Sequence, residues 1–400
     1  AEDYGINVSD ASTDFDKIVK RSRNVAEGMS KGVQFLMRKN KIDVIMGYGK
    51  VKPGKKIEVG TEEGTKTLEA NHIIIATGGR SRVLKGLEQD GKKVIGYREA
   101  LSLKEAPKKM LIVGSGAIGI EFAYFYNAIG TEVTVVEYMD SIVPREDKDV
   151  SKELGKVLKK KGINIITKSA VEFVDTSGEG CKVTVKDNNS DKEIIVECDI
   201  VLSAVGVTPN TENIGLEEVG IKTDRGLVQV DEYYKTNVDG YYAIGDIVPG
   251  AALAHVASAE GILCVEKIAG EHVSPIDYNN IPSCTYCVPE IASVGYTEDA
   301  AKEAGYEIKV GKFPFSASGK ASAAGAKGGF VKVIYDAKYG ELLGAHMIGY
   351  NVTEMIAEIV VARKLETTGH EILKSIHPHP TISEAIMEAT ADAYGEVIHL

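Results

Sequence analysis

Residues 110–119 read MLIVGSGAIG, and this stretch decides the fold. Its first four residues are an apolar run typical of a buried strand, and residues 117–129 continue as a helix. Between them lie three glycines in the spacing Gly-x-Gly-x-x-Gly, at Gly114, Gly116 and Gly119. Residues 132–136 predict a second strand, which ends at the acidic residue Glu137. Strand, glycine turn, helix and strand together predict a βαβ unit of a parallel sheet.

The glycine spacing predicts a dinucleotide site. Gly114 permits the tight turn, Gly116 lets the backbone approach a pyrophosphate, and Gly119 lets helix and strand pack closely. The pyrophosphate would lie on free N–H groups at the positive end of the helix dipole. Glu137 would accept a hydrogen bond from the ribose 2′-hydroxyl and repel a 2′-phosphate, so NAD is favoured over NADP. The alternative is a tight turn without a ligand.

Composition restricts the class of protein. The 400 residues contain 47 Lys+Arg and 58 Asp+Glu, a net charge of −11, which disfavours nucleic acid and anionic membranes as partners. No stretch reaches the ~18 uninterrupted apolar residues of a membrane span. The five cysteines are odd in number and mostly dispersed, which suits a reducing compartment. We therefore expect a soluble cytoplasmic protein with about two to four domains.

Upstream of the glycine turn, apolar residues recur at helical spacing from Phe15 to Asn40 and predict one long helix, capped by Thr13 or Asp14. Short strands are predicted next, at Asp43–Met46, Lys56–Val59 and His72–Ala76. The last strand leaves through Thr77-Gly78-Gly79, and a charged linker at 104–109 suggests a domain boundary.

Downstream of Glu137 the pattern continues with a helix at 150–161 and a strand at 163–167. Further strands are predicted at 171–174, 182–186, 193–197 and 200–204, and a helix at 251–269. From about Tyr278 longer strands and two amphipathic helices, 352–363 and 383–394, predict a separate α+β domain.

The segment 377–384 reads HPHPTISE and has two interpretations. Thr381 and Glu384 have the spacing of a helix capping box. Alternatively, the prolines hold an imidazole just before the helix, and the Glu384 carboxylate fixes its tautomer. Such a pair can accept a proton from a thiol. The two roles of Glu384 are compatible.

Two further motifs are weaker. Asp246 follows Gly245 at a strand end and could reach a sugar or ribityl hydroxyl, although a plain turn explains the pair equally well. Cys284 and Cys287 suggest a redox or zinc site. We expect no metal there, because no second cysteine pair or histidine cluster accompanies them, and a three-residue separation in a strand directs the side chains to opposite faces.

Several motifs occur together and in order: Thr77-Gly78-Gly79, the glycine turn, GVTPN at 206–210, Gly245-Asp246 with LAH at 253–255, and the 377–384 segment. This combination resembles the pyridine nucleotide–disulfide oxidoreductases over essentially the whole chain. The resemblance implies an α/β fold with two doubly wound, Rossmann-like nucleotide-binding domains, the first incomplete, and a C-terminal α+β dimerisation domain. The implied divisions are 1–107 (remainder of the FAD domain), 108–230 (NAD domain), 231–277 (return of the FAD domain) and 278–400 (dimerisation domain).

The resemblance also implies roles for individual residues. His379 would be the catalytic acid/base, oriented by Glu384 and serving the active site of the other subunit of a homodimer. FAD would be held by Gly49, Thr77, Gly78, Gly79, Asp246 and Ala254. NAD would be held by Gly114, Gly116, Gly119, Glu121, Glu137, Val171 and Gly206. In such enzymes the residue at Glu121 pairs with a lysine beside the flavin.

The implied reaction is flavin-dependent oxidation of dihydrolipoamide, carried on a lipoyl domain, to lipoamide with reduction of NAD. The partners would be components of a 2-oxoacid dehydrogenase or glycine-cleavage complex, with no nucleic acid and no membrane. The family's N-terminal strand, FAD glycine motif, Cys-x4-Cys disulfide and lysine do not occur here, so we expect this chain alone to be inactive. The alternatives are an inactive NAD-binding or dimerisation module, or a glutathione reductase, mercuric reductase or soluble transhydrogenase.

Overall fold

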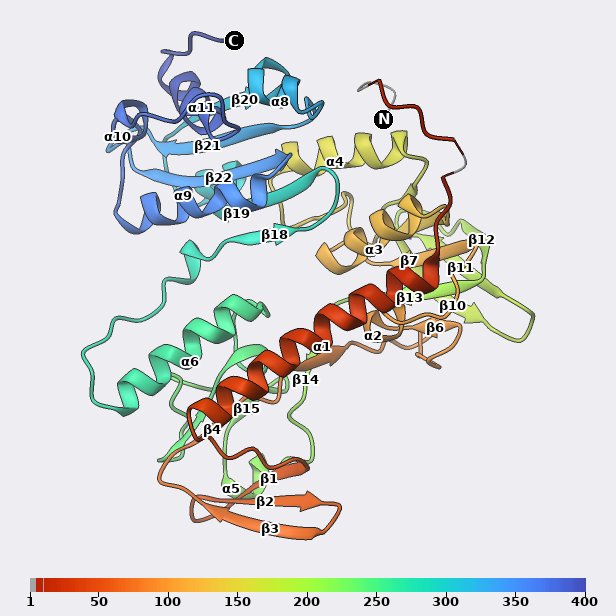
Figure 1. The fold of residues 1–400 in the computed structure, drawn as a ribbon, viewed down its shortest axis with the longest axis vertical. Coiled ribbons are helices and arrows are strands. Elements are labelled where there is room, and N and C mark those ends of the chain that lie inside the picture. The colour runs from red at the N-terminus through yellow and green to blue at the C-terminus, as the bar shows by residue number, and fades with distance from the viewer. Residues whose placement is uncertain (1–4, 10) are drawn as a thin grey trace. The chain divides into compact units, whose positions relative to one another are not determined.

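The computed structural model describes residues 5–9 and 11–400, which form two compact units. The larger unit contains the described residues up to Leu36 together with Val83–Val205 and Ser283–Leu400 (Figure 1). The smaller unit contains Met37–Arg82 and Gly206–Pro282. Among the described residues, no helix has both the length and the apolar character needed to cross a membrane.

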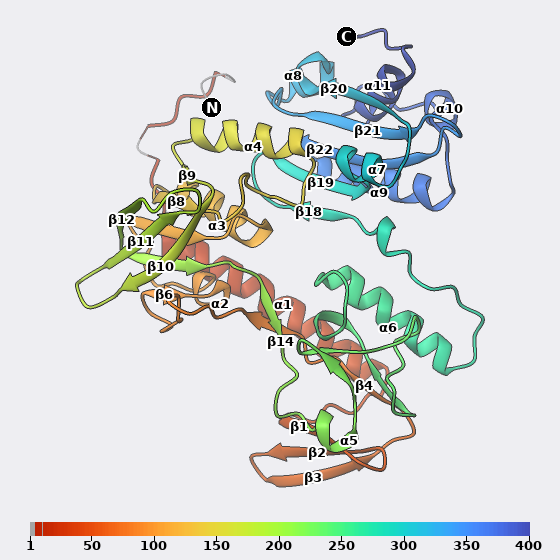
Figure 2. The same ribbon diagram turned by 180° about the vertical axis from the view of Figure 1, so that it is seen from behind.

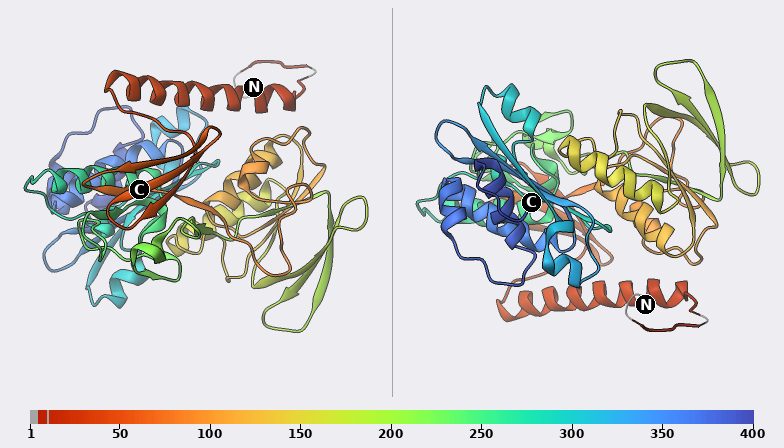
Figure 3. Two further views of the ribbon diagram at one scale, coloured as in Figure 1. Left: turned by 90° about the horizontal axis from the view of Figure 1, so that it is seen from below. Right: turned by 90° about the horizontal axis from the view of Figure 1, so that it is seen from above.

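A five-stranded parallel sheet is the centre of the larger unit and confirms the predicted βαβ architecture. Its strands in spatial order are β6 (Val94–Ile95), β13 (Ile200–Ser203), β7 (Lys109–Val113), β8 (Glu132–Val136) and β9 (Asn164–Ile166). Helices α3 (Ala117–Ala128) and α4 (Lys148–Lys160) lie side by side against it and share one apolar core, and α2 (Tyr97–Ala100) is a single turn (Figure 3).

The two faces of β7 show why its sequence is continuously apolar. Met110 and Ile112 belong to the core that includes α3 and α4. Leu111 and Val113 point to the other face, into a core formed with a three-stranded antiparallel sheet. That sheet consists of β10 (Ser169–Asp175), β11 (Cys181–Asp187) and β12 (Glu193–Cys198). The strand is therefore buried on both faces, as expected for a central parallel strand.

The C-terminal part of the larger unit is the predicted α+β domain. Its antiparallel sheet has the order β18 (Ser283–Thr285), β19 (Glu290–Gly295), β22 (Leu342–Gly349), β21 (Phe330–Asp336) and β20 (Ile308–Pro314). Helix α9 (Val352–Lys364) packs on β19 and β22, and α11 (Glu384–Tyr394) packs on β20 and β21 (Figure 2). The shorter helices are α7 (Glu298–Glu303), α8 (Gly319–Ala323) and α10 (Gly369–Lys374).

The smaller unit combines short strands with one long helix. One antiparallel sheet consists of β1 (Tyr48–Lys52), β2 (Lys56–Thr61) and β3 (Gly64–Glu69). Two further sheets have two strands each. One pairs β4 (Ile73–Ile75) in parallel with β17 (Tyr241–Ala243), and the other pairs β5 (Gly79–Ser81) antiparallel to β14 (Val207–Pro209). The remaining elements are α5 (Leu216–Val219), β15 (Thr223–Asp224), β16 (Leu227–Val228) and α6 (Ala254–Ile268). Buried residues of β1, β4 and β17 share one core.

Two expectations from the sequence need correction. Asp43–Met46 is not a strand: it has no strand partner among the described residues, and Val44 and Met46 are 61% and 80% exposed. Cys287 does not lie in a strand, because β18 ends at Thr285. The predicted separation of the two cysteines nevertheless holds, since Cys284 packs against the core of the C-terminal sheet and Cys287 against that of α3 and α4.

The predicted long helix is present as α1 (Phe15–Lys39), and its cap is Asp14, whose Oδ1 accepts a hydrogen bond from the Lys17 N–H at 3.1 Å. Asp14 carries a lowered pKa, chiefly because of this bond. None of the residues of α1 is buried, and the Phe15 ring approaches that of Tyr126 with centroids 6.3 Å apart. Phe15 packs against the core of α3 and α4, whereas Val25, Met29 and Val33 of the apolar face are exposed.

A buried lysine ties the C-terminal sheet to the parallel-sheet part of the larger unit. The Lys332 ammonium on β21 donates to both oxygens of Asp147, the N-cap residue of α4, at 2.9 and 3.0 Å. It also contacts Asp149 at 3.1 Å and Glu298 at 2.8 Å. Lys332 and Asp147 are only 3% and 2% exposed. Three carboxylates therefore compensate the desolvation of one cation, and the pKa of Lys332 is raised despite its burial.

We predict that Lys332→Ala lowers the free energy of unfolding by about 3–5 kcal/mol, because it leaves the Asp147 carboxylate buried without a counter-charge. Lys302→Ala is the matched control, since it removes an exposed lysine paired with the same Glu298. It should cost about 0–1 kcal/mol. Urea denaturation of both variants checks this, and equal losses would contradict it.

Candidate functional site

The glycine turn after β7 has the geometry that a pyrophosphate site needs. Gly114 has φ +97°, and a Cβ there would lie 2.5 Å from the Ala204 carbonyl oxygen. A Cβ on Gly119 would lie 2.0 Å from the Gly114 carbonyl oxygen, so only glycine allows α3 to start this close to the strand. Gly116 is the N-cap residue of α3 and offers no side-chain cap. The space around it is open, so a ligand can approach the backbone at the start of this helix.

Glu137 organises the same turn from the end of β8. Its Oε2 accepts hydrogen bonds from the Ser115 N–H at 2.8 Å and the Ser115 hydroxyl at 2.6 Å. Its Oε1 accepts one from the Met139 N–H at 2.8 Å. The carboxylate is buried, 6% exposed, and Oε1 keeps a further lone pair for a sugar hydroxyl, whereas Oε2 already accepts two hydrogen bonds. Glu137 therefore connects the ends of β7 and β8, and its contact with a ribose stays a prediction.

The other residues expected at the NAD site lie in different elements. Glu121 is on α3, where its Oε1 accepts a hydrogen bond from the Tyr286 N–H at 2.9 Å, and burial raises its pKa. Val171 lies in β10 at an irregularity of the strand register. Gly206 belongs to the smaller unit, where its carbonyl oxygen accepts from the Arg82 N–H at 3.0 Å.

The expected FAD residues all belong to the smaller unit. Thr77 and Asn210 exchange two hydrogen bonds, from the Thr77 hydroxyl to the Asn210 carbonyl at 2.7 Å and from the Asn210 amide to the Thr77 carbonyl at 3.1 Å. Gly78 has φ +68° and also accepts from the Asn210 N–H. These bonds join the exit of β4 to the segment at 206–210, two of the motifs on which the family resemblance rests.

Asp246 lies against this exit. Its Oδ2 would be 3.3 Å from a Cβ on Gly79, so the glycine leaves room for the carboxylate. Ala254 is the first residue of α6, whose N-cap residue Leu253 provides no side-chain cap. An acceptor carboxylate and an open helix N-terminus are therefore available to a flavin dinucleotide. Gly49 pairs with Val59 in another sheet, where a side chain would meet only ordinary contacts.

His379 and Glu384 are brought together as predicted. Glu384 Oε1 lies 2.9 Å from His379 Nδ1, and its Oε2 accepts from the Thr381 N–H at 2.8 Å. Burial tends to raise the pKa of Glu384, but these bonds hold it below its ordinary value. Thr381 is not the N-cap of α11, which is Ser383, so only the glutamate half of the predicted capping box is present. The same carboxylate also holds the imidazole. The His379 side chain is 79% exposed, so Nε2 is available to a substrate.

The sequence did not indicate two carboxylates that hold the segment around His379 and the turn at Gly245. Glu358 on α9 accepts from His377 Nε2 at 2.9 Å and anchors the histidine two residues before His379. Glu260 on α6 is 1% exposed, and it accepts from the Gly245 N–H at 2.6 Å and from the Tyr278 hydroxyl. Only the helical spacing of the flanking residues could have indicated that these glutamates face inward.

The cysteine pair has no features of a redox or metal site. Both thiols are free, and burial raises the pKa of Cys284 and that of Cys287, the latter to about 12. Protonated thiols are poor nucleophiles and poor metal ligands. Among the described residues, no group of three or more His, Cys, Asp or Glu side chains is arranged to hold a metal ion.

The open glycine turn and the uncapped helix beside Asp246 are compatible with bound dinucleotides, and the imidazole–carboxylate pair is compatible with proton transfer. The family description "Pyridine nucleotide-disulphide oxidoreductase" matches residues 5–261, and the dimerisation domain of that family matches residues 281–390. The chain belongs to the pyridine nucleotide–disulphide oxidoreductases, as its motifs predicted.

Within this family the similar proteins carry one name. A dihydrolipoyl dehydrogenase of Zymomonas mobilis is 49% identical and matches all of this chain and 86% of its own length. One of Rhizobium etli is 48% identical with the same coverage. The solved structure of LpdA from Mycobacterium tuberculosis has a TM-score of 0.88 at 29% identity, covering 95% of this chain and 83% of that one. These relatives give no support to the expectation that this chain alone is inactive.

We predict that Glu358→Gln lowers the pKa of His377. The hydrogen bond and charge of Glu358 raise that pKa, against the opposing effect of burial. A raised folded-state pKa contributes stability that is fully present below the unfolded value of about 6.5 and lost as pH rises through the folded value. The stability lost in Glu358→Gln should therefore be larger at pH 6 than at pH 9.

Histidine titration by NMR and urea denaturation at both pH values test this. Glu366→Gln, an exposed glutamate two residues beyond α9, is the control and should change neither. An unshifted His377 titration would contradict the prediction.

Proposed function

We propose that this protein catalyses FAD-dependent oxidation of dihydrolipoamide to lipoamide with reduction of NAD. The observation that carries this is the exposed His379 imidazole held by Glu384. Relatives at 48–49% identity named dihydrolipoyl dehydrogenase support the dithiol substrate over those of the other disulfide reductases considered above.

In this proposal the pair at His379 moves the substrate proton. With Nδ1–H donating to Glu384 Oε1, the Nε2 lone pair is free to accept a proton from a substrate thiol. The resulting imidazolium lies beside an ionised carboxylate, which stabilises it. The Thr381 N–H fixes the second carboxylate oxygen, so the imidazole plane is oriented before substrate binds.

NAD would be held at the glycine turn. The open N-terminus of α3 at Gly116 would hold the pyrophosphate, Gly114 and Gly119 provide the close approach, and Glu137 would accept from the ribose. We propose Glu121, Val171 and Gly206 as further contacts. Their support is the family resemblance alone.

The residues present also fit part of an FAD site. Asp246 would accept from the ribityl chain, and the start of α6 at Ala254 would direct N–H groups and the helix dipole at the flavin. Thr77, Gly78, Gly79 and Gly49 would line the dinucleotide with backbone atoms. When bound, FAD supplies the electron relay between a dithiol and a nicotinamide.

We further propose a homodimer in which His379 serves the active site of the other subunit. The dimerisation domain supports this, as does the apolar side chain of Ile376, three residues before His379 in the chain, which is 99% exposed. The domain divisions 1–107, 108–230, 231–277 and 278–400 belong to the same proposal. The partner of the dimer would be a lipoyl domain of a 2-oxoacid dehydrogenase or glycine-cleavage complex.

We predict that His379→Gln in the FAD-loaded enzyme lowers kcat for dihydrolipoamide oxidation by about 10²–10⁴-fold, the range for losing a general acid/base. The measurement is steady-state NADH formation. His399→Gln, which removes an exposed imidazole also paired with a glutamate, is the control and should retain full activity. Activity retained in His379→Gln would overturn the proposed role.

We predict a preference for NAD over NADP of about 10–100-fold in kcat/KM, because a 2′-phosphate beside Glu137 meets a like charge and loses hydrogen bonds worth about 1–3 kcal/mol. Comparable kcat/KM values for NADH and NADPH would contradict this. Lys159→Gln, a charge change on an exposed residue of α4 outside the glycine turn, should leave the preference unaltered.

A further inference from the structure

Ser115, the residue between the first two glycines of the turn, is fully enclosed in the larger unit. It is 0% exposed, and its hydroxyl donates a hydrogen bond to Glu137 Oε2 at 2.6 Å. The backbone N–H of Ser115 donates to the same oxygen at 2.8 Å. Both donors of one residue are therefore directed at a single carboxylate oxygen, and hydrogen bonds to an ionised acceptor are stronger than those between neutral groups.

These two bonds determine which oxygen of Glu137 is open to a ligand. Oε2 accepts both of them and has no further lone pair. Oε1 accepts one bond, from the Met139 N–H at 2.8 Å, and keeps one lone pair. The carboxylate cannot rotate without breaking these bonds, so Oε1 is held in one position before a ligand arrives.

The acceptor groups of Ser115 are engaged by Val143. The Val143 N–H is shared between the Ser115 carbonyl oxygen at 3.1 Å and Oγ at 3.2 Å. Because this N–H occupies an acceptor position of the hydroxyl, the hydroxyl proton is directed at Glu137. Ser115 therefore joins Val143 to Glu137 through its side chain as well as through its backbone.

The backbone of Val143 is strained in the conformation that makes this contact. Its φ is +40°, a region that β-branched residues rarely occupy, and the residue is 4% exposed. Strain of this kind persists only where the surroundings fix it. The Val143 carbonyl oxygen accepts hydrogen bonds from the Ser151 hydroxyl at 3.2 Å and from the Glu146 N–H at 2.9 Å. Both peptide groups of Val143 are thus fixed.

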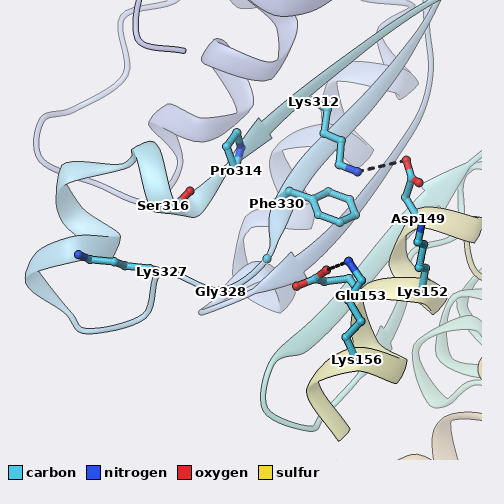
Figure 4. A pocket seen from close by; sticks show the side chains of 11 residues that line it. Asp149, Lys152, Glu153, Lys156, Lys312, Pro314, Ser316, Lys327, Gly328 and Phe330 are labelled. Atoms are coloured by element: carbon cyan, nitrogen blue, oxygen red, sulfur yellow. Dashed lines mark hydrogen bonds and ion pairs between the residues drawn. The ribbon is translucent and has the colours of Figure 1, made fainter. Parts of the chain in front are cut away.

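The start of α4, which carries Ser151, is itself held by the C-terminal sheet. Asp149 pairs with Lys312 of β20 at 3.3 Å, as the dashed line in Figure 4 shows. It also pairs with the buried Lys332 of β21 at 3.1 Å. Ser151 lies two residues further along the same helix. A continuous series of contacts therefore leads from the C-terminal sheet through α4 to the hydroxyl of Ser115.

We propose that Ser115 is a positioning residue that sets the preference for NAD over NADP by holding Glu137. The proposal rests on the NAD site proposed above. With the hydroxyl present, Oε1 is fixed where a ribose 2′-hydroxyl can donate to it, and a 2′-phosphate meets a carboxylate that cannot turn away. Without the hydroxyl, Glu137 is held less firmly, so it accepts less well from the ribose and repels a phosphate less.

Calorimetric binding of NADH and NADPH to the unmodified chain and to Ser115→Ala tests this without FAD or a thiol substrate. The variant should bind NADH about tenfold more weakly, the effect of losing one hydrogen bond to a charged group. Its affinity for NADPH should change by about threefold at most, so the ratio of the two dissociation constants narrows. Ser115→Cys, which keeps the side chain but donates only weakly, should narrow the ratio in the same direction.

Two further variants separate positioning from a general structural effect. Ser203→Ala is the matched control, since Ser203 is a buried serine on the neighbouring strand β13 whose hydroxyl has no hydrogen-bond partner among the described residues. It should leave both dissociation constants unchanged. In a Glu137→Gln background, Ser115→Ala should not narrow the ratio further, because its effect runs through the carboxylate.

The possible results distinguish the role of Ser115 from the NAD site itself. Equal weakening of NADH and NADPH by Ser115→Ala, or the same narrowing in the Glu137→Gln background, would overturn the role of Ser115 and leave the NAD site in place. Failure of the unmodified chain to bind NADH would overturn the NAD site, and this inference with it.

Discussion

The close approach of α3 to β7 is the constraint on which the nucleotide site depends. With no side chain at position 119, the first turn of the helix lies against the carbonyl of Gly114, and any Cβ there would meet that oxygen at 2.0 Å. This contact directs the N-terminus of α3 at the space beyond the strand. The buried Ser115–Glu137 hydrogen bonds then hold the turn to the neighbouring strand. A phosphate site made of backbone N–H groups needs this rigidity, since it has no charged side chain of its own.

Carboxylates that hold other groups recur throughout the molecule. Glu137 holds the glycine turn, Glu260 holds Gly245 next to Asp246, and Glu384 holds both His379 and the loop before α11. Each uses its two oxygens for different partners, which fixes the carboxylate as well as the group it binds. Glu137 and Glu260 are buried, and buried acceptors are costly unless they are paired, so these two carboxylates specify one local conformation.

The larger unit also shows how one ion-pair network affects two regions. Lys332 requires Asp147 and Asp149 to compensate its burial, and this joins the C-terminal sheet to the start of α4.

The sequence alone determined the elements whose pattern is local. These are the strand and glycine turn at 110–119, the acid at Glu137, and the histidine–glutamate pair at 377–384. Each could be predicted because it is specified by residues that lie close together in the sequence. The sequence misassigned Asp43–Met46, because an apolar run becomes a strand only where another strand pairs with it. The partnership of Glu358 with His377, of Glu260 with Tyr278, and of Lys332 with three carboxylates joins residues on separate elements. Only the tertiary structure decided these, because hydrogen bonds and charges act over distances in space that the order of residues does not encode.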